Sequence, residues 1–159
     1  MSHDTVITPG NTEGIYGVIH FKNHAVGILP IDEDGCTWLV SQSRYVMGKL
    51  SWEIPEVGCP MGEDILEAAK RELREETGLS ARDWQHWLNM DLSNSVTDEQ
   101  ATVYLAQGLT KGESNLEVTE DIDVKKVPIS QAIDMVLSGE ITDAISVAAL
   151  MKYAATSRL

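Results

Sequence analysis

The chain has 159 residues, a length that suits one domain and is too short for two of ordinary size. Hydrophobic residues make up 43% and charged residues 23% of it, which is typical of a folded globular protein and excludes a disordered chain. The 25 acidic residues outnumber the 12 basic ones and give a net charge of −13, which argues against nucleic acid or an anionic membrane as a partner, because both would be repelled.

An acidic protein can still bind a phosphorylated small molecule when divalent cations lie between the phosphate and the carboxylates. Cys36 and Cys59 are too few for a disulfide framework, which favours a reducing compartment. The first ten residues lack both the basic and the apolar segment of a secretory signal, and the longest apolar run, residues 144–150, is too short to cross a bilayer. We therefore expect a cytoplasmic protein.

Strand signals dominate the first part of the chain. Residues 1–14 are polar, contain a Pro-Gly pair and are expected to form a flexible lead-in before a single domain over residues 15–159. Residues 15–31 contain two β-rich runs around a Lys-Asn turn, and residues 36–42 alternate as a strand does. Together these runs predict a set of antiparallel strands over residues 15–42.

The clearest predicted helix runs from residue 65 to residue 77. Asp64 and Glu67 form a capping box at its start, and Gly78 supplies the residue that ends it in a left-handed conformation.

Downstream, the pattern predicts strands at 83–91 and 100–107, another from Ile122, a helix capped by Ser130, and a last helix that starts near Thr142 or Asp143. Strands mixed with three helices in one domain indicate an α/β or α+β fold.

Three carboxylates share one face of the first helix. Glu72, Glu75 and Glu76 are spaced i, i+3 and i+4, beside the apolar stripe of the helix. One interpretation is a solvated acidic face, which is the usual explanation of such a run. The other is a site for Mg²⁺ or Mn²⁺, because carboxylate oxygens on one rigid face can hold a hard cation that in turn accepts a phosphate.

The wider pattern decides between these interpretations. Glu63 is followed by seven residues and then by Arg71-Glu72-Leu73-Arg74-Glu75-Glu76-Thr77-Gly78-Leu79. This resembles the Nudix box, G-x5-E-x7-R-E-U-x-E-E-x-G-U with U an aliphatic residue, the signature of the Nudix hydrolase family. Every fixed position from Glu63 to Leu79 matches, and Val57 replaces the leading glycine, with Gly58 next to it.

The resemblance implies a fold class and a set of roles. The fold is α/β, the Nudix α/β/α sandwich with a mixed central sheet between helices. Its divalent-cation ligands fall on Glu72, Glu75 and Glu76, joined by the backbone carbonyl of Glu56. Three further residues of the box take structural roles: Arg71 as an ion-pair partner, Glu63 as its acceptor, and Gly78.

Segments outside the box resemble the ADP-ribose pyrophosphatase and nucleotide-sugar hydrolase branch of that family. LVSQSR at 39–44 and WEIP at 52–55 are similar to the LVxQYR and WELPAG segments of the branch, with Ser43 in place of tyrosine and Glu56-Val57 in place of Ala-Gly. The SNSVTDE loop is similar to SPGFSDE, and residues 119–144 match the closing pattern of the branch.

The branch also implies roles for residues beyond the helix. Glu120 matches an acidic loop position that completes the metal site or acts as general base, and Glu117 on the same loop is the second candidate for the base. The alternative is that both are solvated loop acids. Glu99 is a further candidate ligand.

Three residues are candidates for substrate binding. Arg44 could grip a phosphate or close an ion pair at a strand end. Glu53 could bind substrate or metal-bound water, or it could pair with Arg71. Trp52 offers an aromatic face for a nucleobase, although a place in the core is the more usual explanation of such a tryptophan.

The resemblance implies hydrolysis of the diphosphate linkage in a nucleoside diphosphate bound to a sugar, such as ADP-ribose, with Mg²⁺ or Mn²⁺ as cofactor. Alternatives are a pyrophosphohydrolase of oxidised nucleoside triphosphates and a nucleotide sensor without activity. Relatives in this branch are commonly homodimers that share N-terminal strands, and we expect the same here, with neither nucleic acid nor membrane as a partner.

Overall fold

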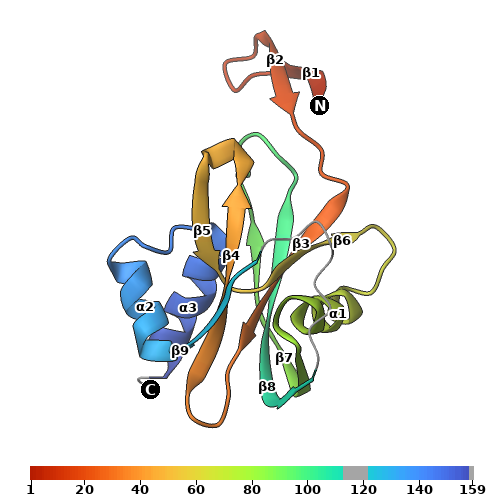
Figure 1. Ribbon diagram of the computed structural model, residues 1–159. Helices are drawn as coiled ribbons and strands as arrows, with labels where there is room; N and C mark the ends of the chain where they lie inside the picture. The colour runs from red at the N-terminus through yellow and green to blue at the C-terminus, as the bar shows by residue number, and fades with distance from the viewer. Residues whose placement is uncertain (113–121, 158–159) are drawn as a thin grey trace.

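A computed structural model describes residues 1–112 and 122–157 (Figure 1). The strands are β1 (Ser2–Ile7), β2 (Glu13–Val18), β3 (Asn23–Pro30), β4 (Cys36–Arg44), β5 (Lys49–Glu53), β6 (Glu56–Pro60), β7 (Leu79–Asp91), β8 (Gln100–Lys111) and β9 (Val124–Pro128). The helices are α1 (Ile65–Thr77), α2 (Ile129–Leu137) and α3 (Ala144–Thr156), with a short 3-10 turn at Tyr45–Met47.

The strands form three sheets, of which the largest is mixed. Its order is β6-β3-β8-β7, with β3 parallel to β8 and antiparallel to β6. A second sheet has the order β5-β4-β9, and β1 pairs with β2 alone in a third. A mixed sheet with three helices confirms the predicted α/β class.

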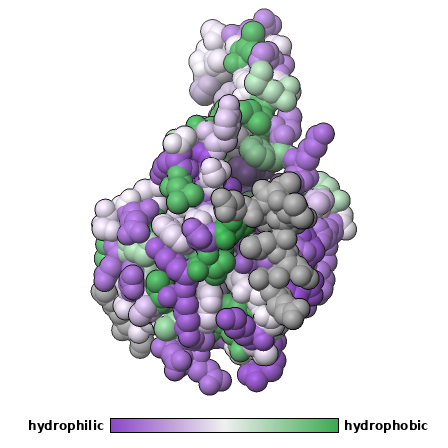
Figure 2. All heavy atoms as spheres, viewed as in Figure 1, coloured by the Kyte–Doolittle hydropathy of each residue, from purple (hydrophilic) through white to green (hydrophobic). Residues whose placement is uncertain are grey.

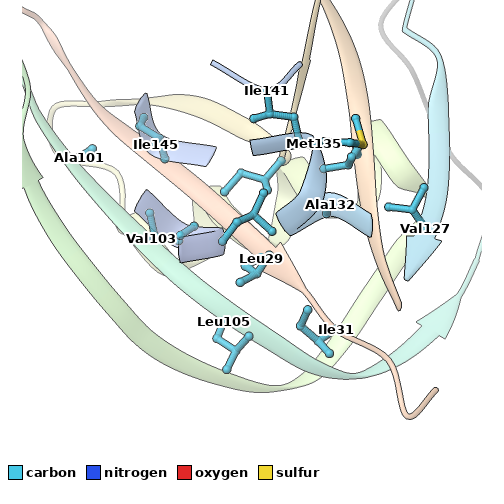
Figure 3. Packing of buried hydrophobic residues seen from close by; sticks show 14 residues of the cluster. Leu29, Ile31, Ala101, Val103, Leu105, Val127, Ala132, Met135, Ile141 and Ile145 are labelled. Carbon is cyan, nitrogen blue, oxygen red and sulfur yellow. The ribbon is translucent and has the colours of Figure 1, made fainter. Parts of the chain in front are cut away.

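Helices cover both faces of the mixed sheet. Ala69 and Leu73 of α1 pack with Val26 and Ile28 of β3 on one face. On the other face, residues of α2 and α3 pack with Leu29 and with β8 in a single buried cluster (Figure 3). Alternate residues of β3 therefore enter opposite cores, as the two-residue period of a strand requires. This is the layered α/β/α arrangement that the resemblance implied.

The N-terminal segment differs from the prediction. Residues 2–7 and 13–18 form a paired hairpin that projects from the rest of the chain, where the sequence analysis expected an irregular lead-in up to residue 14 (Figures 1 and 2). The Pro-Gly pair lies in the turn of this hairpin, where Asn11 takes a positive φ of 57° and its N–H donates to the carbonyl of Thr8 at 2.8 Å. The same turn signal thus closes a hairpin instead of marking a loose end.

The predicted antiparallel set over residues 15–42 is also wrong. β2 pairs with β1, β3 with β6 and β8, and β4 with β5 and β9, so these neighbours in sequence lie in different sheets. Local turn signals predict where strands start and end, but the parallel pairing of β3 with β8 depends on contacts about 76 residues apart, such as Ala25 with Ala101.

The predicted helix starts agree with the structure at α1 and α3 and differ from it at α2. Asp64 accepts from the backbone N–H groups of Leu66 and Glu67, both at 3.0 Å, and Gly78 ends α1 at a φ of 70°. Asp143 caps α3, which agrees with the predicted helix start near Thr142 or Asp143. The predicted Ser130 cap is wrong, because α2 starts at Ile129 directly after Pro128. Among residues 1–112 and 122–157, every helix is too short or too polar to cross a bilayer.

Candidate active site

Three pockets along one side of the domain share lining residues and so form a continuous cleft. The first, of about 340 Å³, is lined by Pro60, Arg71, Glu72 and Glu75 together with residues 56–58. Residues 56–58 also line the second, of about 440 Å³. The second and third pockets have Arg44, Asp143 and Ala144 in common, and the third measures about 460 Å³.

Glu72 and Glu75 of α1 form one wall of this cleft, and Glu76 lies beside them on the same face of the helix. Glu72 and Glu76 are buried, Glu76 with 1% of its surface exposed, and Glu75 is half-buried. The side-chain amide of Gln42, on β4, donates to Oε1 of Glu76 at 2.9 Å. Burial of acidic side chains is costly unless they are compensated, so this face of α1 is not a solvated one.

Arg71 connects the acidic residues of the box. Its Nη1 lies 2.9 Å from Glu75 and 3.5 Å from Glu72, and its Nε lies 3.7 Å from Glu63. One guanidinium therefore links the loop before α1 to two carboxylates of the helix. The repulsion between those carboxylates is reduced by this shared positive charge.

The opposite wall is built around an ion pair between two strands. Nε of Arg44, at the end of β4, donates to both carboxylate oxygens of Glu53 at 3.0 and 3.1 Å, and its Nη2 also contacts this carboxylate. Glu53 is 1% exposed, whereas 42% of the Arg44 side chain is exposed. Arg44 thus closes a strand-end ion pair and still lines the cleft, and Glu53 pairs with Arg44 instead of Arg71.

Glu56, which the family pattern has as alanine, extends this wall toward α3. Its Oε1 accepts from the hydroxyl of Ser146 at 3.1 Å, and the same hydroxyl oxygen accepts from the N–H of Ile54 at 3.0 Å. Burial and then repulsion by the Asp143 carboxylate raise the pKa of Glu56 well above its usual range. Both effects disfavour the charged form of the Glu56 carboxyl.

Carboxylate oxygens of Glu53, Glu56 and Asp143 lie within 4.8 Å of one another, a group of three close enough to hold a cation. Arg44 already neutralises Glu53. The α1 wall offers hard oxygen donors from Glu72 and Glu75 beside an open pocket. Such donors suit Mg²⁺ or Mn²⁺, so the residues present fit a divalent cation.

The remaining candidates are divided between the cleft and other places. Glu99 lines the second pocket, and partial burial raises its pKa. Trp52 packs against the core formed with α2 and α3, and Nζ of Lys125 lies 3.9 Å from its ring centroid. The positions of Glu117 and Glu120 fall outside the described residues.

Sequence reasoning missed several residues of the cleft. Gln42 and Ser146 contact its carboxylates, and Phe21 and Leu92 line its second pocket. Asp143 was one of two predicted starts of the last helix and caps α3, but its place beside Glu56 carries no local signal. The substitution of alanine by Glu56 was the one visible sign that this wall differs from the family pattern.

Known proteins similar to this chain agree with the fold and with the box. The family model described as NUDIX domain matches residues 22–149. An ADP-ribose pyrophosphatase of Mycobacterium tuberculosis is 36% identical over 155 residues, which cover 95% of this chain and 74% of that protein. An ADP-ribose pyrophosphatase of Bacillus subtilis is 33% identical over 122 residues, 76% of this chain and 66% of that protein.

A solved structure described as an ADP compounds hydrolase superposes with a TM-score of 0.84. The superposition covers 99% of this chain and 92% of the chain in that structure, at 20% sequence identity, and so supports the fold. The family match spans most of the chain and includes α1 with its carboxylates. The chain therefore belongs to the NUDIX family.

Proposed function

We propose that this Nudix hydrolase cleaves the diphosphate linkage of a nucleoside diphosphate bound to a sugar, of the ADP-ribose type, and releases a nucleoside monophosphate and a sugar phosphate. The observation that carries this proposal is the α1 wall, where Glu72 and Glu75 line a cleft that continues into two pockets lined by Arg44, with Glu76 buried on the same helix face. Two relatives of 33 and 36% identity that are named ADP-ribose pyrophosphatase support the choice of substrate class.

The cation in this proposal is Mg²⁺ or Mn²⁺, held by Glu72, Glu75 and Glu76 with the carbonyl of Glu56 and with Glu120. When bound, it supplies neutralisation of the phosphate oxygens and orientation of the attacking water. The need for such neutralisation follows from the charge of −13, which by itself repels a diphosphate.

The other residues of the cleft bind and orient the substrate. The exposed part of Arg44 faces two pockets and offers a bidentate grip on a phosphate, while its pair with Glu53 fixes the direction of the guanidinium. Glu120, with Glu117 as the alternative, takes the proton of the attacking water in this proposal.

We also propose a homodimer in the cytoplasm. The projecting β1–β2 hairpin exposes Ile7 and Ile15, with 64 and 79% of their surface accessible, and a second copy could cover them. Light scattering at micromolar concentration tests the dimer, and a monomer would contradict it.

The test is product analysis with Mg²⁺ across ADP-ribose, other nucleotide sugars, dinucleotides and nucleoside triphosphates. We expect rapid cleavage of a nucleotide sugar to two monophosphates, abolished by a chelator. Faster cleavage of a triphosphate would replace the proposal with the pyrophosphohydrolase alternative. Binding without cleavage of any compound would indicate a sensor.

A further inference from the structure

Phe21 and Leu92 form an apolar part of the second pocket, which the start of α3 also lines. Phe21 lies just before β3, with 45% of its surface exposed, and Leu92 follows β7 directly. The polar side chains of Asn23 and Glu99 line the same pocket. An exposed aromatic ring between polar groups at the edge of a cleft suits a planar ligand with hydrogen-bonding edges.

The segment that carries Phe21 is anchored by one carboxylate. Oδ1 of Asp98 accepts from the N–H of Phe21 at 2.9 Å, and its Oδ2 lies 2.7 Å from Nδ1 of His20. Backbone contacts add to this anchor, because the N–H of Ile19 donates to the carbonyl of Val96 at 2.8 Å. The position of Phe21 in the pocket wall thus depends on the loop between β7 and β8.

We propose that the second pocket binds the base of the nucleotide, with Phe21 and Leu92 as its contact surface and Asp98 as the positioning residue. This inference rests on the proposed function and adds the pocket of the cleft in which the base lies. The Glu99 carboxyl oxygen can accept a hydrogen bond from an exocyclic amino group, so an amino-bearing base such as adenine fits the pocket.

The charges next to Leu92 favour the base over a phosphate. The backbone carbonyl of Glu99 accepts from the N–H of Leu92 at 2.9 Å, so the Glu99 carboxylate lies beside this apolar surface and would repel an anionic group. Arg44, which also lines the second pocket, is paired with Glu53. The apolar surface of Phe21 also gains more from a stacked ring than from the hydroxyl groups of a sugar. The diphosphate then reaches residues 56–58, which this pocket shares with the one beside α1.

The first test compares Phe21→Ala and Phe21→Leu with the wild-type protein. In both variants we expect the KM for ADP-ribose to rise about tenfold, with kcat within about twofold, because stacking contributes to binding more than to chemistry. Leu137→Ala is the matched control, since Leu137 is an exposed apolar residue in α2, 67% accessible and outside the cleft. Phe21→Leu keeps the apolar volume and covers the case that Phe21→Ala does not fold.

Calorimetric titration in the presence of Mg²⁺ separates this inference from the proposed function. We expect both Phe21 variants to weaken the binding of AMP and to leave that of ribose 5-phosphate unchanged. Normal cleavage of ADP-ribose together with unchanged AMP affinity in both variants would overturn the inference alone. Failure of the wild-type protein to cleave any nucleotide sugar would overturn the proposed function, and AMP titration would still test the pocket.

The second test concerns Asp98. Asp98→Ala removes both acceptors, so we expect a rise in KM of about threefold or more at constant kcat, whereas Asp98→Asn keeps an acceptor for the N–H of Phe21 and restores most of the affinity. A loss of kcat at unchanged KM, or equal effects of the two substitutions, would overturn the positioning role.

Discussion

The two walls of the cleft both carry carboxylates, but the chain assembles them in different ways. On α1, Glu72, Glu75 and Glu76 lie within five residues, and helical periodicity alone places them on one face. On the opposite wall, Glu53 ends β5 and Asp143 precedes α3, 90 residues further along the chain. Only the fold brings these two together, so a sequence motif reveals the first wall and a structure is needed for the second.

The walls also balance their charge differently. Arg44 forms a bidentate pair with Glu53, and burial raises the pKa of Glu56, which disfavours its charged form. On α1, Arg71 is one cation for Glu63, Glu72 and Glu75 together. The comparison indicates that the α1 wall has more negative charge left for a cation, and the opposite wall positions substrate.

The largest expected effect is a loss of activity in Glu76→Gln, which removes a charge from the α1 wall. We expect kcat/KM for the nucleotide-sugar substrate to fall at least about a hundredfold, equivalent to about 2.7 kcal/mol in the barrier. Glu67→Gln on the same helix is the control, because Glu67 is exposed and paired with Lys70 at 2.7 Å. Equal losses in the two variants would show that helix charge in general, and not this wall, matters.

On the opposite wall, Arg44→Met leaves the buried Glu53 carboxylate without its counter-charge. We expect the free energy of unfolding to fall by about 2 kcal/mol, less than for a fully buried pair because Arg44 is partly exposed. Arg44→Met combined with Glu53→Leu is expected to recover most of this loss. Urea denaturation measures both, and a double variant as unstable as the single one would contradict the pairing.

Ser146→Ala tests the hydroxyl that connects Glu56 to the backbone of Ile54. Removal of this hydroxyl leaves the buried N–H of Ile54 without its acceptor and the buried carboxyl of Glu56 without its donor. We therefore expect a loss of about 1–2 kcal/mol in the free energy of unfolding. Ser130→Ala, at an exposed serine of α2, is the control and is expected to change little. Equal stability of the two variants would disprove the contribution of the Ser146 contacts.

The smallest effect concerns pH at Asp98. The hydrogen bond from the N–H of Phe21 is the main cause that lowers the pKa of this carboxyl below its ordinary value of 3.8, and the hydrogen bond with His20 is the second. The carboxylate form therefore holds the segment at neutral pH, and the contribution is lost as pH falls through the lowered pKa. The amide shift of Phe21 in NMR should report this titration below pH 3.8, and Asp98→Asn should abolish it. A midpoint above 3.8 would contradict the contact.

Local signals predicted much of the fold. The caps at Asp64 and Asp143, the terminator at Gly78 and the strands that became β7 and β8 were all visible in the sequence, because each depends on a few neighbouring residues. The pairing of β3 with β8 and the hairpin at residues 2–18 were not, since strand pairing depends on distant partners.

The residues of the site also divide into those that a local sequence pattern predicted and those that only the fold brings into place. The spacing of Glu72, Glu75 and Glu76 is a local pattern, and the structure places them beside a pocket. Arg44 was recognised with two possible roles, and its contact with Glu53 decides that it forms a strand-end pair. Asp143 gave no sign of its place in the cleft, because that place follows from the packing of α3 against β3.

The measurement that tests the central claim most directly is Mn²⁺ binding followed by electron paramagnetic resonance. It requires no substrate and compares Glu76→Gln, on the α1 wall, with Glu53→Gln, on the opposite one. The account predicts that Glu76→Gln weakens Mn²⁺ binding about tenfold or more and that Glu53→Gln leaves it within about threefold of wild type. Loss of binding in Glu53→Gln with wild-type affinity in Glu76→Gln would place the cation on the opposite wall and contradict the account.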